Sequence, residues 1–333
     1  MLLQQAALND IEKLAEYNQC LIQDEASGNT ASLLELQNRM KGFLENGYKA
    51  YLILEEVTGI ELGYILADFS SEPVFIRHFF IKREYRRKGL GQAAFLQFLD
   101  KEQILGAKLQ ILKWNQPALA FFAQMGFEKA GLRETPEDGK HLWFSLNPWV
   151  AFIPEFILVR ELSLRNRIID TFEEAKRISG WSFQGLRELP FTVNIPGIKI
   201  TLREHMRNVA YTVDKNYDIF RHCYGIQHPE YTWDYTKLIA GALLHDVGKI
   251  IEYSADENGR PYINERGKLM HHSISGAMLA EKHGISEDIV HIIAVHVQDG
   301  MQKFRSPEAA IVNKIDLLHF DPFKSFIGMK QNY

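Results

Sequence analysis

A histidine and an aspartate stand side by side, His245 and Asp246, within an otherwise apolar run from Ala242 to Ile250. Burying charge is costly unless the group is paired or binds a metal. The pair therefore predicts a metal site on one buried helix turn. Lys249 follows His245 by four residues and would share its helix face. There it could contact a phosphate oxygen in a transition state, or be a surface lysine at a helix end.

Four more potential ligands lie on apolar faces of predicted helices in the C-terminal half: His205, His272, His296 and Asp316. Taken singly, each is more often a core residue with a satisfied hydrogen bond. Together with His245 and Asp246 they require a common partner, and these donors suit a borderline or hard divalent metal. The chain offers no cysteine pair for a structural zinc site. His271 adjoins His272, but the spacing to Gly276 favours His272.

The order of these six residues resembles the HD-domain phosphohydrolases over about residues 200–325. The resemblance implies hydrolysis of a phosphoester or phosphoanhydride in a nucleotide-like substrate, with Asp246 and Lys249 as catalytic residues. It also implies a helical bundle around one or two divalent ions (Mn, Fe, Mg, Ni or Zn). The first ion would be held by His205, His245, Asp246 and Asp316. His272 and His296 would hold a second, with Asp246 bridging.

Several substrate classes stay open within this resemblance. Val297 follows His296, where cyclic-di-GMP phosphodiesterases carry a second histidine, so that activity is disfavoured. The segments 267–272 and 306–309 look more like the HD domain of certain 3′-5′ exoribonucleases, and dinucleoside-polyphosphate hydrolases are similar too. A net charge of -4 counts against nucleic acid as a partner. The remaining alternative is a binding or scaffold module that holds a structural ion.

A second pattern lies far upstream, at Arg86-Arg87-Lys88-Gly89-Leu90-Gly91, between an apolar strand over 75–81 and an amphipathic helix. Glycines let the backbone approach a ligand closely, and a helix N-terminus attracts phosphate. A basic turn that merely caps a helix is the alternative reading of this motif alone.

Arg86-x-x-Gly89-x-Gly91, followed by Asn115-x-x-Ala118, Phe121-Phe122 and Gly126-Phe127, resembles the GNAT acyltransferases over residues 1–148. The resemblance implies acetyl-CoA as cofactor and an amine as acetyl acceptor. It implies that strand 75–81 splays to pair with the pantetheine arm. The cofactor-binding residues would be Phe80, Ile81, Arg86, Arg87, Lys88, Gly89, Leu90, Gly91 and Asn115, with backbone amides of 88–91 at the pyrophosphate.

One position departs from this family. Many members carry a tyrosine seven residues after the asparagine, as an acid for the leaving thiolate, where this chain has Phe122. A phenyl ring has no proton to give. Three alternatives stay open. Another residue donates the proton, or the thiolate leaves without a proton donor. In the third, the domain is a non-catalytic acyl-CoA sensor that regulates the hydrolase. Glu72 and His78 are candidate bases by position, although each also reads as a solvated side chain.

Apolar periodicity predicts the elements that position these residues. We expect Asn115 to cap a helix that Gly126 terminates. Expected helices cover 7–17, 90–102, 117–125 and 168–178, and helices dominate from Leu202. Expected strands cover 50–55, 62–69, 74–81, 109–113 and 141–146, and one begins at 127.

Together with the two resemblances, the patterns predict two domains of different class. Residues 1–148 would form an α/β (α+β) mixed sheet with flanking helices, 149–200 a connector with a helical segment, and 201–333 an all-α bundle. The chain has only two cysteines, no leader-like N-terminus and no apolar run of membrane-spanning length, which together predict a cytoplasmic protein without a membrane partner. The oligomeric state is left open.

Overall fold

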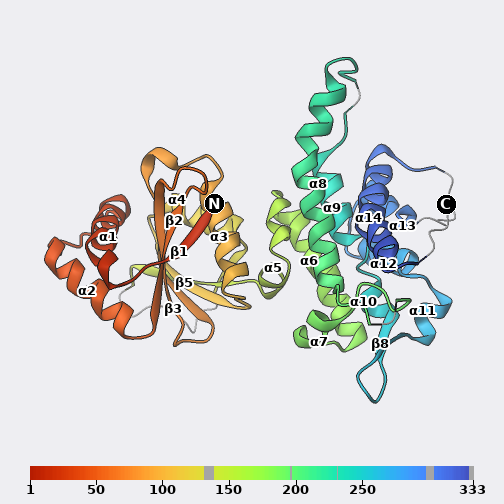
Figure 1. Ribbon diagram of the computed structural model, residues 1–333, viewed down its shortest axis with the longest axis horizontal. Coiled ribbons are helices and arrows are strands. Elements are labelled where there is room, and N and C mark those ends of the chain that lie inside the picture. The colour runs from red at the N-terminus through yellow and green to blue at the C-terminus, as the bar shows by residue number, and fades with distance from the viewer. Residues whose placement is uncertain (131–138, 196, 231, 298–303, 330–333) are drawn as a thin grey trace. The chain divides into compact units, whose positions relative to one another are not determined.

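The computed structural model describes residues 1–130, 139–195, 197–230, 232–297 and 304–329. Contacts divide the chain into two compact units, Met1–Ala151 and Phe152–Tyr333, which Figure 1 colours from red to blue along the sequence. The three-part division expected from the sequence stays a prediction. Within the second unit, the helix of the expected connector packs against helices further along the chain.

The first unit is built on a seven-stranded sheet in the order β1-β2-β3-β4-β5-β7-β6. Neighbours are antiparallel except for the parallel pair β4 and β5. That pair is joined only from Val74–Ala107 to Ile76–Leu109, so residues 77–81 diverge from β5 as expected. The strands are β1 (Leu2–Gln5), β2 (Tyr48–Leu54), β3 (Glu61–Asp68), β4 (Val74–Ile81), β5 (Ala107–Leu112), β6 (Phe127–Lys129) and β7 (His141–Leu146).

Helices cover both faces of this sheet (Figure 1). Alternate side chains of a strand point to opposite faces, and β2 shows the consequence. Leu52 joins the buried cluster beneath α1 and α2, whereas the Tyr51 ring contacts Phe98 of α3 with centroids 5.7 Å apart. The helices are α1 (Ile11–Glu25), α2 (Leu33–Glu45), α3 (Leu90–Lys101) and α4 (Gln116–Gln124).

The mixed sheet with flanking helices confirms the predicted fold class of this half. Asn115 caps α4 as predicted, its side-chain oxygen accepting from the Ala118 N–H at 3.2 Å. The first helix begins at Ile11 rather than residue 7, because Leu8–Asp10 forms a 3-10 turn. The sequence analysis missed β1 and α2, although Ser32 and Glu35 form a capping box that marks the start of α2.

The second unit is a helical bundle, as predicted, but a short hairpin of β8 (Tyr253–Ala255) and β9 (Pro261–Ile263) interrupts it. Pro148–Phe152 forms the short helix α5 where the two units join. The other helices are α6 (Leu162–Ser179), α7 (Phe183–Glu188), α8 (Leu202–Gly225), α9 (Tyr235–Leu244), α10 (Lys249–Glu252), α11 (Glu265–Leu269), α12 (His272–Lys282), α13 (Glu287–Val295) and α14 (Pro307–Phe326). None of the described helices has an apolar stretch long enough to cross a bilayer.

The centre of this bundle is α9, whose residues from Leu238 to Leu244 are all buried. A helix that is apolar all round needs neighbours on every side, and α9 packs against α8, α13 and α14. The helix ends at Leu244, so His245 and Asp246 lie in the turn before α10 rather than inside a helix. A Cβ on Gly248 in that turn would lie 2.0 Å from the carbonyl oxygen of His272, so only glycine allows this close approach.

Candidate metal centre and candidate cofactor cavity

The second unit brings all six predicted ligands together from five parts of the chain. They form two groups, and within each group one nitrogen or oxygen atom per residue lies within 4.8 Å of the others. The helices α8, α12 and α14 carry His205, His272 and Asp316, while the others follow the ends of α9 and α13. The groups are His205, His245 and Asp316, and Asp246, His272 and His296.

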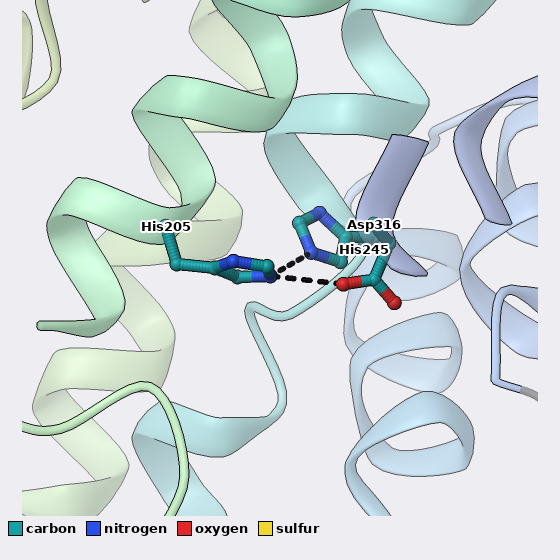
Figure 2. A group of neighbouring side chains, drawn as sticks. All are labelled: His205, His245 and Asp316. Atoms are coloured by element: carbon teal, nitrogen blue, oxygen red, sulfur yellow. Dashed lines mark hydrogen bonds and ion pairs between the residues drawn. The ribbon is translucent and has the colours of Figure 1, made fainter. Parts of the chain in front are cut away.

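The first group centres on Nε2 of His205 (Figure 2). This nitrogen lies 3.0 Å from Oδ1 of Asp316 and 3.2 Å from Nε2 of His245. It is also 3.4 Å from Oδ2 of Asp246, which links the first group to the second. His205 and His245 are buried, so the first group is shielded from solvent.

The second group centres on Oδ1 of Asp246. This oxygen lies 3.4 Å from Nε2 of His272 and 3.5 Å from Nε2 of His296. The aspartate is only 1% exposed, and its Oδ1 has no hydrogen-bond partner among the described residues. Buried polar atoms are nearly always hydrogen-bonded, so this oxygen requires another partner.

Three of the four imidazoles are oriented by an acceptor at Nδ1. His245 donates to the carbonyl oxygen of Ala242 and His296 to that of Ile293, both over 2.7 Å. A carbonyl oxygen only accepts, so Nδ1 carries a proton, and in the neutral ring Nε2 presents a lone pair. His272 likewise directs Nδ1 at a carboxylate oxygen of Glu252 over 2.9 Å. Such outer partners are typical of metal-binding histidines.

These contacts make the residues fit a divalent cation. In neutral rings, the Nε2 lone pairs of His272 and His296 face a carboxylate oxygen that lacks a hydrogen bond. Such atoms repel one another unless a proton or a metal cation lies between them. The donors are imidazole nitrogens and carboxylate oxygens, a set that suits borderline or hard divalent metals. Asp246 belongs to the second group, and its other oxygen, Oδ2, lies 3.4 Å from Nε2 of His205 in the first. Its role as a bridging ligand stays a prediction.

The buried carboxylate is kept ionised by its neighbours. Burial alone would raise the pKa of Asp246, but Lys249 and His245 outweigh it and hold that pKa well below the usual range. The Lys249 ammonium lies 2.7 Å from Oδ2 of Asp246 and donates to the Phe191 carbonyl oxygen at 2.9 Å. Its side chain is 12% exposed, so the surface-lysine reading is wrong.

The other histidines of this unit have different partners. His271 caps α12, accepting from the Ser273 N–H at 3.4 Å, which separates its role from that of His272. His319 contacts the Thr212 hydroxyl at 2.9 Å, and His291 accepts from the Ser306 N–H at 3.2 Å.

The first unit holds a cavity of about 380 Å³ where β4 diverges from β5. It is lined by seven of the nine residues expected to bind the cofactor: Phe80, Ile81, Arg86, Arg87, Gly89, Gly91 and Asn115. Lys88 and Leu90 instead line a separate hollow with Tyr85. The cavity also contains side chains that the sequence analysis did not identify, among them Asp24, Glu25 and Phe79.

The glycine loop at this cavity has the geometry of an anion site. Gly89 precedes α3 with a φ of 75°, a conformation that glycine adopts readily. The first N–H groups of a helix lack partners within the helix and attract anions. Arg86 is not free here, because it donates to the Ile81 carbonyl oxygen at 2.7 Å and pairs with Asp24. Asp24 also pairs with Arg83.

The positions discussed for acid–base chemistry in this half do not all lie at the cavity. Phe122 lines the cavity, so the departure from the family pattern lies where the cofactor is expected. Glu72 and His78 do not line it. Nδ1 of His78 lies 2.9 Å from the Tyr64 hydroxyl, and burial lowers the pKa of His78 to about 3. The structure therefore gives no support to either residue as a base at this cavity.

Comparison with known proteins identifies two families. Residues 14–127 match the acetyltransferase (GNAT) family and residues 203–321 match the HD domain. A ribonuclease Y from Oleidesulfovibrio alaskensis is 28% identical over 134 residues, which cover 38% of this chain. The matched part is 23% of that relative, so the chain spans under a quarter of its length.

Two solved acetyltransferases are also similar to part of this chain. One is the PaiA N-acetyltransferase of Thermoplasma acidophilum, solved with coenzyme A, which is 17% identical with a TM-score of 0.34. The match covers 44% of this chain and 99% of the PaiA chain. The other is an acetyltransferase of Thermus thermophilus, which is 15% identical with a TM-score of 0.35. The match covers 43% of this chain and 94% of the Thermus chain.

Proposed function

Because this chain joins a GNAT-family domain to an HD domain, we propose that it is a bifunctional enzyme. The HD half is a metal-dependent phosphohydrolase that acts on a phosphoester or phosphoanhydride of a nucleotide-like substrate. The GNAT half binds acetyl-CoA and transfers its acetyl group to an amine. The observation that carries the first activity is the buried Oδ1 of Asp246, which faces two imidazole nitrogens and has no hydrogen bond within the described chain.

The residues of the HD half would bind and orient the metal ions. His205, His245, Asp246 and Asp316 would hold one divalent ion, and His272 and His296, with Asp246, a second. When bound, such ions supply Lewis acidity toward phosphoryl oxygens and lower the pKa of water. Lys249 keeps Asp246 ionised at neutral pH. The Nδ1 contacts hold the rings so that Nε2 is available without rearrangement.

The phosphohydrolase is tested with the full chain loaded with Mn²⁺. Metal content by elemental analysis is compared with hydrolysis of bis(4-nitrophenyl) phosphate, a diadenosine polyphosphate and a single-stranded RNA. We expect bound metal and hydrolysis of at least one substrate, both lost in Asp246→Ala. A metal-loaded protein that hydrolyses none of them would instead support a structural ion.

RNA is the second candidate substrate class for this half. The similarity to a protein named ribonuclease Y supports it, whereas the net charge of -4 counts against a broad basic surface. Release of nucleotides from the RNA, without hydrolysis of bis(4-nitrophenyl) phosphate or the diadenosine polyphosphate, would favour a 3′-5′ exoribonuclease-like activity. The reverse pattern would favour the small nucleotide-like substrate.

Acetyl transfer is supported by the seven expected residues that line the cavity, while Phe122 motivates the acyl-CoA sensor as the alternative. Calorimetry with CoA tests binding, and release of free thiol from acetyl-CoA in the presence of a panel of amines tests transfer. Amine-dependent turnover supports the enzyme. Tight CoA binding without turnover supports the sensor.

A further inference from the structure

The cofactor cavity contains a carboxylate to which the acetyl-transfer proposal assigns no role. Glu25 is the last residue of α1 and lines the cavity together with Asn115 and Phe122. Its backbone oxygen accepts from the indole N–H of Trp114 at 3.0 Å. This bond joins the end of α1 to the residue next to Asn115, which is one of the residues expected to bind the cofactor.

Glu25 differs from the neighbouring Asp24 in its partners. Asp24 is neutralised by ion pairs with Arg83 and Arg86. Within the described residues, the Glu25 carboxylate has neither a hydrogen bond nor an ion pair, and the charged groups acting on it are His141 and Asp24. Burial raises the pKa of Glu25, which reflects the cost of a carboxylate beside apolar groups.

The surrounding wall is aromatic. The rings of Phe79 and Phe121 stack with centroids 5.4 Å apart, and Phe122 meets Phe121 edge-on at 5.1 Å. Ring faces attract cations, and their bodies bury apolar carbon. A carboxylate without a partner and a phenyl wall both favour a ligand that carries positive charge on an apolar group.

We propose that Glu25 binds the cationic amino group of the acetyl acceptor, and that the acceptor is therefore an alkylammonium or arylalkylammonium compound. This inference rests on the proposed acetyl-CoA function of the same cavity. It concerns recognition: Glu25 selects for charge, and the phenyl rings select for the apolar part of the acceptor.

The test uses the full chain saturated with CoA, so that binding is measured without turnover. Calorimetry compares two cationic probes, n-butylamine and 2-phenylethylamine, with the uncharged 2-phenylethanol. The variants are Glu25→Gln and, as a matched control, Glu16→Gln, which removes an exposed carboxylate from the same helix. CoA affinity is measured in every variant to show that the cavity is intact.

We expect at least one cationic probe to bind the wild-type complex more tightly than 2-phenylethanol. Glu25→Gln should weaken binding of that probe roughly tenfold, the scale of one charge-assisted hydrogen bond. Glu16→Gln should leave it unchanged. Intact CoA binding with no cation binding, or with equal affinity in wild type and Glu25→Gln, overturns the role of Glu25 alone. Absence of CoA binding to the wild type overturns the acetyl-CoA proposal, and this inference with it.

Discussion

One oxygen of Glu252 contacts both the backbone N–H and the ring Nδ1 of His272. The backbone N–H donates to Oε2 over 2.7 Å, and Nδ1 lies 2.9 Å from the same oxygen. Glu252 is 5% exposed, so solvent does not compete for this oxygen. The two bonds fix the ring and leave its Nε2 facing Asp246. Glu252 is therefore a positioning residue for the candidate metal centre.

The first prediction concerns this positioning. Glu252→Ala should weaken Mn²⁺ binding by about tenfold to a hundredfold, the usual effect of removing a partner that orients a metal-binding histidine. Glu252→Gln keeps an acceptor oxygen and should recover most of the affinity. Calorimetric titration of the full chain with Mn²⁺ measures both. Glu257→Ala, on the exposed tip of the hairpin, is the matched control, and equal losses in both alanine variants would rule out a specific role.

The second prediction separates metal binding from stability. Asp246→Ala should lose metal and also destabilise the HD half by roughly 3–5 kcal/mol, since it leaves the Lys249 ammonium buried without its carboxylate. The double variant Asp246→Ala/Lys249→Met should recover stability in urea unfolding but not metal by elemental analysis. CoA binding should persist in both variants. Metal retained in Asp246→Ala would refute the assignment.

The third prediction is a pH dependence of the GNAT half. The pKa of His78 is lowered to about 3, below its ordinary value of 6.5. Between these values the unfolded chain binds a proton at His78 that the folded chain does not. The contribution of His78 to stability is therefore complete above pH 6.5 and falls as the pH decreases toward 3. Between pH 6.5 and 3, the free energy of unfolding should fall by up to ~1.4 kcal/mol per pH unit because of this one group.

Hydrogen exchange of the β3 and β4 amides, corrected for intrinsic rates, measures this loss in the full chain. His78→Gln, which keeps hydrogen-bonding groups but does not titrate, should remove most of the dependence. His228→Gln changes an exposed histidine of the other unit and should have no effect. A dependence that persists in His78→Gln would assign it to another group.

The fourth prediction tests the glycine loop. Gly89→Ala places a Cβ on a residue with a φ of 75°, at a cost of roughly 1 kcal/mol, and should distort the loop and weaken CoA binding. Gly59→Ala has almost the same backbone conformation, a φ of 69°, and equally open surroundings in another turn. Gly59→Ala should lower the free energy of unfolding by a similar amount without changing the affinity for CoA. Calorimetry on the two variants decides whether the loop holds the cofactor.

The residue types of the metal centre could be predicted because each interrupts an apolar pattern. His205 and Asp316 lie beside stripes of buried residues on α8 and α14, and a polar group in such a stripe needs a buried partner. The periodicity that places them inside is local along the chain. Their convergence follows once α8, α9 and α14 pack together.

Partners that lie far apart in the chain could not be predicted in this way. Glu252 and His272 are 20 residues apart, and Asp24 and Arg86 are 62 apart. A carboxylate at the end of a helix has the pattern of a surface residue, as at Asp24, Glu25 and Glu252. Only the packing of other elements around these positions shields them from solvent. It gives Asp24 and Glu252 their partners and leaves Glu25 at the cavity without one among the described residues.

The sequence by itself determined the order of the two domains, their fold classes and the chemical types of the candidate ligands, because these follow from spacing and periodicity along the chain. The tertiary structure alone decided that Lys249 lies inside, that Nε2 is the available nitrogen of three imidazoles, and that Glu25 lines the cavity without a partner among the described residues. The physical reason is that burial and charge pairing depend on distances between residues remote in sequence. Packing sets those distances, and no local pattern encodes them.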